Sequence, residues 1–219
     1  MNDPIKKFVE ELSEEKVNKD SINHYSFEYS ISRGFASKIN LLCYLTTMKK
    51  LIKTKTLLLG EAPGHKGCTL TGVPFTSEAI IGSGKYKLFN YDEGWDDFID
   101  EKDVKLQSEA TATIVWNTFD ELDIYPLLWN AYPFSPFNSK TNKPNRKPTN
   151  AEIENVGKKY FEKLLKIIPV KNFVAVGKVA ESAYKLFGIN DFESIRHPSF
   201  GGKSEFIDGL KRLKEKNFF

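Results

Sequence analysis

The chain has 219 residues, of which 40% are hydrophobic and 28% charged, so it can bury a core without disulfides or a structural metal. A formal net charge of only +3 is weak support for nucleic-acid binding. Any such prediction must rest on local clusters of basic residues. Two cysteines, Cys43 and Cys68, are too few for a disulfide framework or a four-thiolate cluster. The chain shows neither a signal peptide nor a transmembrane segment, so we expect a cytoplasmic protein.

Apolar spacing in the first half of the chain predicts helices around one buried strand. Helices are expected at residues 4–20, 35–52 and 107–121. The strand covers 56–60, and an irregular loop follows over 61–75. Thr76-Ser77-Glu78 resembles a helix start, and the acidic stretch 91–103 is expected to be a surface excursion.

Three further apolar strands alternate with helices in the second half. The strands are expected at 124–129, 173–177 and 194–196. Thr149 and Glu152 have the spacing of a capping box, which opens a helix to about residue 168. Two more helices are predicted, over 179–187 and 203–216.

This alternation predicts a three-layer α/β/α fold with a central, mainly parallel four-stranded sheet. No repeat, low-complexity run or linker divides the chain. We therefore expect one domain over residues 1–219, with 1–53 as a helical extension packed on it.

Polar residues follow three of the predicted strands. They are Glu61, Asn130 and His197. The carboxyl ends of parallel strands meet at one edge of a sheet, where ligands bind in open α/β folds. We expect these three side chains to share one pocket.

Several short motifs resemble the uracil-DNA glycosylase superfamily, in the form of its family 4-like branch. Gly60-Glu61-Ala62-Pro63-Gly64 with Gly72-Val73-Pro74-Phe75 resembles the first motif, and His197-Pro198-Ser199 resembles the late His-Pro-Ser motif. The other matches are the strand 127–130, the stretch 144–149 and the helix start 177–180.

The resemblance covers about residues 54–212 in the right order. It implies a monofunctional DNA glycosylase that flips uracil, or a related deaminated base, out of DNA and hydrolyses the N-glycosidic bond. The implied partner is DNA containing such a base, and we expect a monomer without membrane association. Family 4 enzymes hold an iron–sulfur cluster with four cysteines. With two cysteines, this chain resembles a cluster-free relative, and no cofactor or metal is expected.

The resemblance also implies the residues that bind the base. Phe75 would stack on it, a contact worth about 1–3 kcal/mol, and Asn130 would read the N3–H and O4 of uracil with its amide. Gly60, Ala62, Pro63, Gly64 and Ser199 would complete the pocket. The alternative interpretations are that Phe75 is an ordinary core residue and that Asn130 is a turn residue after a strand.

Two residues are expected to be catalytic. His197 would donate a hydrogen bond to uracil O2, and Glu61 would orient water or stabilise the cationic sugar. As alternatives, His197 is satisfied within a turn and Glu61 caps backbone amides. The branch usually has acidic residues where this chain has His65-Lys66-Gly67. The best-known members carry aspartate at the position of Ala62, so Glu61 or the backbone must hold the water.

Other residues are expected to contact DNA. Phe200 would wedge into the base stack, and Lys140, Lys143, Arg146 and Lys147 would contact phosphates. As alternatives, Phe200 packs or forms a mobile loop tip, and the basic cluster is a solvated loop.

Two other classes stay open at this point. One is a catalytically weak or inactive protein that binds nucleobases or nucleic acid on the same fold. The other is a nucleotide-hydrolysing α/β enzyme, which is disfavoured because the chain has neither a phosphate-binding Gly-x-x-x-x-Gly-Lys-Ser/Thr loop nor a clustered acidic metal site.

Overall fold

The structure is a computed structural model that describes residues 3–28, 31–51, 55–89 and 105–219. The chain divides into two compact units. The first comprises Met1–Thr47, Pro63–Trp116 and Phe134–Arg146, and the second comprises Met48–Ala62, Asn117–Pro133 and Lys147–Phe219. The single domain expected from the sequence stays a prediction. The acidic stretch 91–103 lies outside the described residues.

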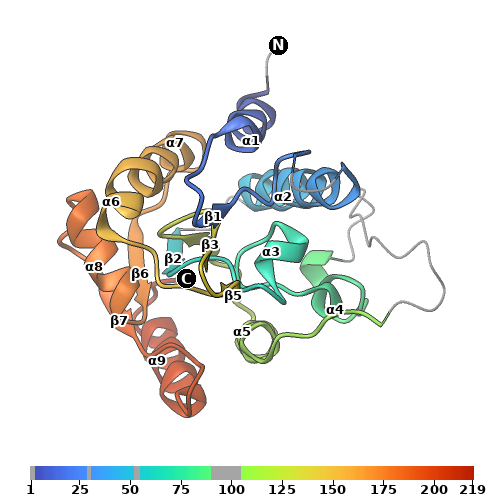
Figure 1. Ribbon diagram of the computed structural model, residues 1–219. Helices are drawn as coiled ribbons and strands as arrows, with labels where there is room; N and C mark the ends of the chain where they lie inside the picture. Colours follow the sequence, from blue (N-terminus) through green and yellow to red (C-terminus); the bar gives the residue numbers. More distant parts are fainter. Residues whose placement is uncertain (1–2, 29–30, 52–54, 90–104) are drawn as a thin grey trace. The chain divides into compact units, whose positions relative to one another are not determined.

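The second unit is built on a parallel sheet in the order β3-β2-β6-β7 (Figure 1). Its strands are β2 (Thr56–Gly60), β3 (Leu127–Asn130), β6 (Asn172–Val176) and β7 (Glu193–Ile195). Every residue of β2 and β3 is buried, as in strands that are covered on both faces. Leu57 lies opposite both Leu127 and Phe173 in the register. The predicted α/β fold, with a four-stranded parallel sheet flanked by helices, is confirmed.

Helical segments of the same unit flank this sheet (Figure 1). They are α6 (Asn150–Glu152), η2 (Ile153–Gly157), α7 (Lys158–Ile167), α8 (Lys178–Phe187) and α9 (Lys203–Glu215). Helix α8 contacts β6 and β2, and Tyr184 Oη donates to the carbonyl of Leu57 at 3.3 Å. Helix α9 contacts β7 at Gly209, where a Cβ would come within 2.7 Å of Ile195 Cγ2.

The helical stretch over 150–167 begins with the capping box that the sequence predicts. The Glu152 N–H donates to Thr149 Oγ1 at 3.2 Å, and the Thr149 N–H donates to the Glu152 carboxylate at 2.7 Å. Its middle segment, η2, is a π-helix. There Gly157 leaves room for the carbonyl of Ala131, which occupies the place of a Cβ. Because Ala131 follows β3 directly, this contact fixes the helix against the end of that strand.

The first unit combines helices with a small antiparallel sheet. Its helices are α1 (Pro4–Glu14), α2 (Ile31–Lys50), α3 (Cys68–Thr71), α4 (Glu78–Ile81), η1 (Lys87–Phe89) and α5 (Ala110–Leu122). Helices α2 and α5 each end in the second unit. The sheet has the order β1-β4-β5, with β1 (Ser21–Ile22), β4 (Ser135–Asn138) and β5 (Lys143–Pro144). The sequence had predicted only loops for the segments that form α3, β4 and β5.

Helix α1 ends at Glu14 and not at residue 20, because a side chain further along caps it. Asn23 Nδ2 donates to the carbonyls of Leu12 at 2.9 Å and Glu15 at 3.0 Å. These bonds satisfy carbonyls that the end of a helix leaves free. No described helix is both long enough and apolar enough to cross a membrane.

Residues near the N-terminus help to form the core of the first unit. Tyr25 Oη donates to the carbonyl of Gly72 at 3.0 Å. His24 Nδ1 lies 3.1 Å from Ser135 Oγ, which lies 2.7 Å from Thr69 Oγ1. The N-terminal segment therefore holds both α3 and β4 in place.

Candidate active site

The parallel strands of the second unit end beside the polar residues that the sequence singles out. Gly60 ends β2 opposite Asn130, the last residue of β3, and Glu61 follows Gly60. Gly177, directly after β6, has a φ of +86°. A Cβ there would lie 3.2 Å from His197 Cβ, so glycine makes room for the histidine. Glu61, Asn130 and His197 therefore lie at the carboxyl edge of one sheet.

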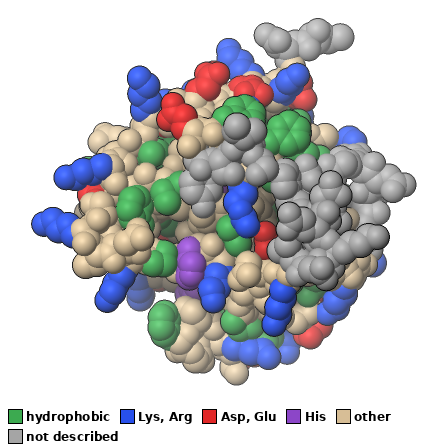
Figure 2. Space-filling model, turned by 45° about the vertical axis from the view of Figure 1, so that its right-hand side comes forward, with side chains coloured by type: hydrophobic (Ala, Val, Ile, Leu, Met, Phe, Trp, Pro, Cys, Tyr) green, Lys and Arg blue, Asp and Glu red, His purple; other side chains and the backbone are tan. Residues whose placement is uncertain are grey.

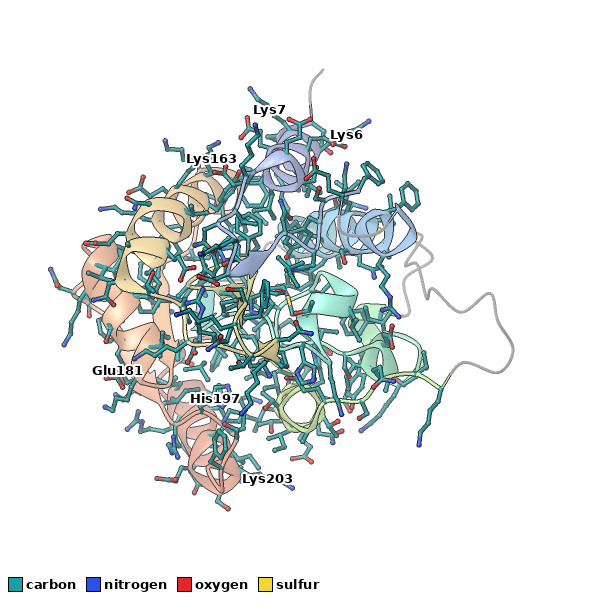
Figure 3. All side chains as sticks on the ribbon, viewed as in Figure 1. Lys6, Lys7, Lys163, Glu181, His197 and Lys203 are labelled. Atoms are coloured by element: carbon teal, nitrogen blue, oxygen red, sulfur yellow. The ribbon has the colours of Figure 1, made fainter. Side chains whose placement is uncertain are left out.

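His197 is held by the residue two positions further along the chain. Its Nδ1 lies 2.8 Å from Ser199 Oγ, and the Ser199 N–H donates to Nδ1 at 3.2 Å. Because a backbone N–H can only donate, Nδ1 is the acceptor, and the neutral ring carries its hydrogen on Nε2. Burial, together with the charge of Arg196, lowers the pKa of His197 and favours the neutral ring. Figure 3 shows His197 near the start of α9, where Lys203 lies.

Glu61 is half-buried just after β2. Burial raises the pKa of its carboxyl, and the positive charge of Lys147 opposes that shift. The pairing of β2 and β3 continues past the strand ends, because the Tyr132 N–H donates to the carbonyl of Glu61 at 3.1 Å. The backbone therefore fixes the carboxylate at the edge of the sheet, beside a cation.

Asn130 is only 4% exposed at the end of β3. The next residue, Ala131, donates its N–H to the carbonyl of Gly60 at 2.9 Å. The amide of Asn130 thus lies at the buried end of β3, an edge strand that is held by its pairing with β2. Such a group can read the edge of a nucleobase without first paying for its own ordering.

Phe75 belongs to the first unit, where its backbone is clamped. Its φ is +56°, in the left-handed region that a bulky residue adopts only when its surroundings impose it. Trp116 Nε1 donates to the carbonyl of Phe75 at 3.2 Å and to Thr76 Oγ1 at 3.1 Å. Phe75 itself is 9% exposed. Its place relative to Asn130, in the other unit, stays a prediction.

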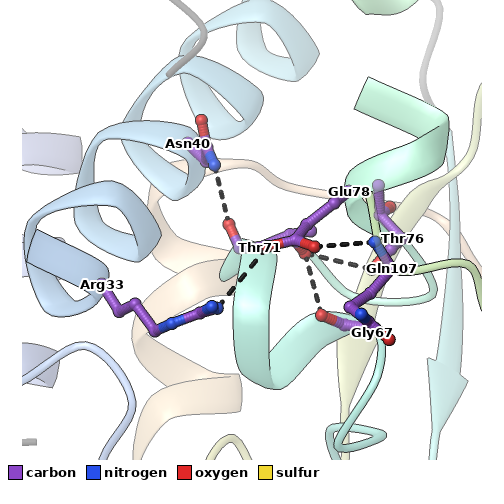
Figure 4. Close-up of polar contacts among 7 residues, drawn as sticks. All are labelled: Arg33, Asn40, Gly67, Thr71, Thr76, Glu78 and Gln107. Atoms are coloured by element: carbon purple, nitrogen blue, oxygen red, sulfur yellow. Dashed lines mark hydrogen bonds and ion pairs between the residues drawn. The ribbon is translucent and has the colours of Figure 1, made fainter. Parts of the chain in front are cut away.

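The turn before Phe75 is built around Thr71 (Figure 4). Thr71 Oγ1 accepts from the Val73 N–H at 3.2 Å and donates to the carbonyl of Thr76 at 3.0 Å. Asn40 Nδ2 donates to the carbonyl of Thr71 at 3.1 Å. These hydrogen bonds hold the loop in place, although its sequence shows little of the periodicity that predicts a helix or a strand.

Phe200 is the second phenylalanine with a left-handed backbone. Its φ is +51°, and its side chain is 97% exposed. The other described non-glycine residues with positive φ are all asparagine or aspartate, which tolerate this region. Phe75 and Phe200 are therefore the described phenylalanines with a left-handed backbone. The sequence predicts that Phe75 contacts the base and that Phe200 contacts the DNA stack.

The basic residues predicted to contact phosphates divide into two kinds. Lys140 and Lys143 are exposed on the β4–β5 hairpin. Arg146 Nε donates to the carbonyl of Phe137 at 3.2 Å, and Nη2 donates to the carbonyl of Asp20 at 3.1 Å, so its guanidinium braces the small sheet. Figure 2 shows Lys and Arg side chains projecting from the surface at many separate places.

Asn145 is held against His65 within the first unit. The His65 N–H donates to Asn145 Oδ1 at 3.0 Å, and Asn145 Nδ2 lies 2.9 Å from His65 Nδ1. Asn145 and the loop after Gly64 are thus in direct contact. Among the described residues, no group of three or more His, Cys, Asp or Glu side chains is placed to hold a metal ion.

Two residues near the site loop were missed by the sequence analysis. Trp116 and Glu109 were expected only as parts of the helix at 107–121, whereas Trp116 donates to the carbonyl of Phe75 and the Glu109 carboxylate lies against Gly64 and Gly67. Nothing local in the sequence marks either of them, because both act on turns about 40 residues away along the chain. The hydroxyl of Ser199 contacts His197, and the predicted role of Ser199 in substrate binding stays a prediction.

Two comparisons with known proteins bear on the family and the fold of the chain. The model of the uracil DNA glycosylase superfamily matches residues 50–213. The crystal structure of wild-type Pedobacter heparinus SMUG2 resembles the chain with a TM-score of 0.65 at 15% sequence identity, over 99% of each chain. No curated protein sequence matches.

The chain therefore belongs to the uracil DNA glycosylase superfamily. The likeness to SMUG2 is one of fold, which confirms the predicted architecture. The assignment to a family 4-like branch stays a prediction.

Proposed function

We propose that this protein is a monofunctional DNA glycosylase that flips uracil, or a related deaminated base, out of DNA and leaves an abasic site. The observation that carries the proposal is the state of His197. Its Nδ1 accepts from Ser199, so a neutral ring offers Nε2–H at the ligand-binding edge of the sheet. That is the donor needed by a base that departs as an anion.

The buried amide of Asn130 would select the base. Its oxygen accepts from uracil N3–H while its NH₂ donates to O4, a pattern that cytosine does not match. Phe75 would stack on the base, and its clamped backbone supports that role because it holds the ring in one orientation. The pocket expected around Gly60, Ala62, Pro63, Gly64 and Ser199 belongs to this proposal.

Glu61 would act on the sugar. As the N-glycosidic bond breaks, positive charge develops on the deoxyribose, and an ionised carboxylate stabilises it. The cation of Lys147 favours that ionised form of Glu61. Glu61 therefore suits an electrostatic role better than that of a proton acceptor.

DNA would be held by the exposed groups. Lys140 and Lys143 suit phosphate contacts, and Lys147 would serve both Glu61 and the backbone. Phe200, exposed at the tip of its turn, would fill the space that the flipped base leaves. The guanidinium of Arg146 braces the hairpin through two carbonyls, and its predicted contact with phosphate belongs to this proposal as well. We propose that the protein acts as a monomer.

The test is release of free base from oligonucleotides that carry uracil in single strands, U·G pairs and U·A pairs, with hypoxanthine and xanthine substrates beside them. Alkaline strand cleavage at the abasic site reports the product. Release that Glu61→Gln reduces supports the proposal. Tight binding of uracil-containing DNA without release, unchanged in Glu61→Gln, would instead support a binding protein on the same fold.

A further inference from the structure

Gly202 lies where the turn after His197 meets the first residue of α9. The carbonyl oxygen of His197 occupies the place that a Cβ on Gly202 would take. That Cβ would also lie 2.9 Å from Arg196 Cγ and 3.2 Å from the carbonyl oxygen of Ser199. The φ of Gly202 is −79°, a value that residues with side chains ordinarily adopt. The position therefore requires glycine for the close approach of α9 to this turn and not for its backbone conformation.

The backbone of Gly202 closes the turn on one side and begins the helix on the other. Its N–H donates to the carbonyl of Ser199 at 3.1 Å, and its carbonyl accepts from the Phe206 N–H at 3.0 Å. Phe206 is fully buried, so the turn is anchored to a fixed part of α9. The Ser199 N–H donates to His197 Nδ1 at 3.2 Å. The position of the imidazole therefore depends on how closely Gly202 packs against the turn.

The same turn carries Phe200 at its exposed tip. Gly201, beside it, has a φ of +82°, and a Cβ there would have no described atom beyond its chain neighbours within 4 Å. The base of the turn is packed on two sides, because Gly177 lies against His197 Cβ and Gly202 against its carbonyl. The tip is therefore open, whereas the residue that carries the imidazole is confined.

We propose that Gly202 is a positioning residue for the glycosylase reaction, because the absence of its side chain lets α9 hold His197 with Nε2–H available to the departing base. This inference rests on the proposed function. His197 is the residue that touches the base, and Gly202 acts through the geometry of the turn. A side chain on Gly202 would force the carbonyl of His197 to move, and a misplacement of about 1 Å can cost about 10² in rate.

The experiment compares Gly202→Ala with Gly209→Ala, a matched control on the same helix. A Cβ on Gly209 would come within 2.7 Å of Ile195 Cγ2, so the control crowds α9 against β7 at a side chain and not at the His197 carbonyl. Uracil release from single-stranded DNA gives kcat and KM. Gly202→Ala should lower kcat by about 10² and change KM less than about threefold. Gly209→Ala should lower the melting temperature but keep the wild-type kcat.

A spectroscopic measurement separates positioning from packing. The chain has three histidines, so nitrogen-15 NMR of the free protein can resolve the ring nitrogens of His197. The wild type and Gly209→Ala should show one neutral tautomer, with its hydrogen on Nε2. Gly202→Ala should show a mixture of the two tautomers. Ser199→Ala should keep the Nε2–H tautomer, because Gly202 still closes the turn and the backbone N–H still reaches Nδ1.

Three results would overturn the inference while leaving the glycosylase proposal intact. They are wild-type kcat or a single Nε2–H tautomer in Gly202→Ala, an equal loss of kcat in Gly209→Ala, and mixed tautomers in Ser199→Ala. The last result decides the matter even if Gly202→Ala does not fold. Absence of base release by the wild type would instead overturn the proposed function, and the tautomers would still report how Gly202 holds the turn.

Discussion

Ser199 fixes the tautomer of His197. Its backbone N–H lies 3.2 Å from His197 Nδ1, and its hydroxyl lies 2.8 Å from the same atom. Pro198, buried between the two residues, restricts the backbone of this turn. A ring held in this way has its hydrogen on Nε2 before any substrate arrives, so the donor needs no reorganisation when negative charge develops.

Ser199→Ala removes the hydroxyl but keeps the backbone N–H. We expect base release to slow by about tenfold, the scale of one hydrogen bond of about 0.5–1.5 kcal/mol, because the ring loses one of the two groups that hold Nδ1. Single-turnover kinetics measure the effect. Ser194→Ala, at an exposed position of β7, is the matched control and should act at the wild-type rate. Equal rates for the two variants would show that Ser199 does not position the histidine.

The pH dependence follows from the charge beside Glu61. The carboxylate must be ionised to stabilise a cationic sugar, and burial raises its pKa. Activity should therefore fall as the pH drops through that raised pKa, by about tenfold per pH unit. Lys147→Ala removes the opposing cation, raises the pKa further and moves the acid limb of the profile to higher pH.

Lys178→Ala is the control for charge at a distance, since Lys178 is exposed and pairs with Glu181. Its acid limb should stay where the wild type has it. A Lys147→Ala profile that superimposes on the wild-type profile would mean that Glu61 does not set the acid limb.

Trp116→Phe should affect both stability and substrate binding. The change leaves the buried carbonyl of Phe75 without its donor, which costs about 1–3 kcal/mol in the free energy of unfolding. It also releases the left-handed backbone of Phe75, so KM for the oligonucleotide should rise. Phe89→Leu is the control, because Phe89 packs on the Trp116 ring at 4.6 Å and should alter stability alone. A rise in KM of the same size in both variants would contradict the clamp.

Phe200→Ala should leave the free energy of unfolding within about 0.5 kcal/mol of wild type, because the ring is exposed. Base release from duplex DNA should slow by at least about tenfold, since opening the stack costs a few kcal/mol per step. Release from single-stranded DNA should keep its rate. Equal losses on both substrates would assign Phe200 a role other than the wedge.

The residues at the strand ends could be predicted because their signals are local. Glu61 and Asn130 stand at the ends of apolar runs, His197 follows the short strand predicted at 194–196, and parallel strands must end at one edge. The capping box of Thr149 and Glu152 was predictable for the same reason, since both partners lie within one helical turn.

What the sequence did not predict depends on contacts between distant segments. Asn23 caps the end of α1 by donating to the carbonyls of Leu12 and Glu15. Asn23 lies eight or more residues beyond these carbonyls in the sequence, so no local pattern predicts the contact. Trp116 and Glu109 reach turns about 40 residues away. The β4–β5 hairpin has very short strands, and β5 consists of lysine and proline, so no apolar alternation marks it.

The most direct test measures the rate of uracil release from a single-stranded oligonucleotide with enzyme in excess. It compares the wild type with His197→Ala. If the neutral imidazole stabilises the departing base, the variant should be slower by about 10²–10³, the effect of losing one such donor. The far-ultraviolet circular dichroism of the two proteins should coincide. A His197→Ala protein that releases uracil at the wild-type rate would contradict the role of this strand edge in catalysis.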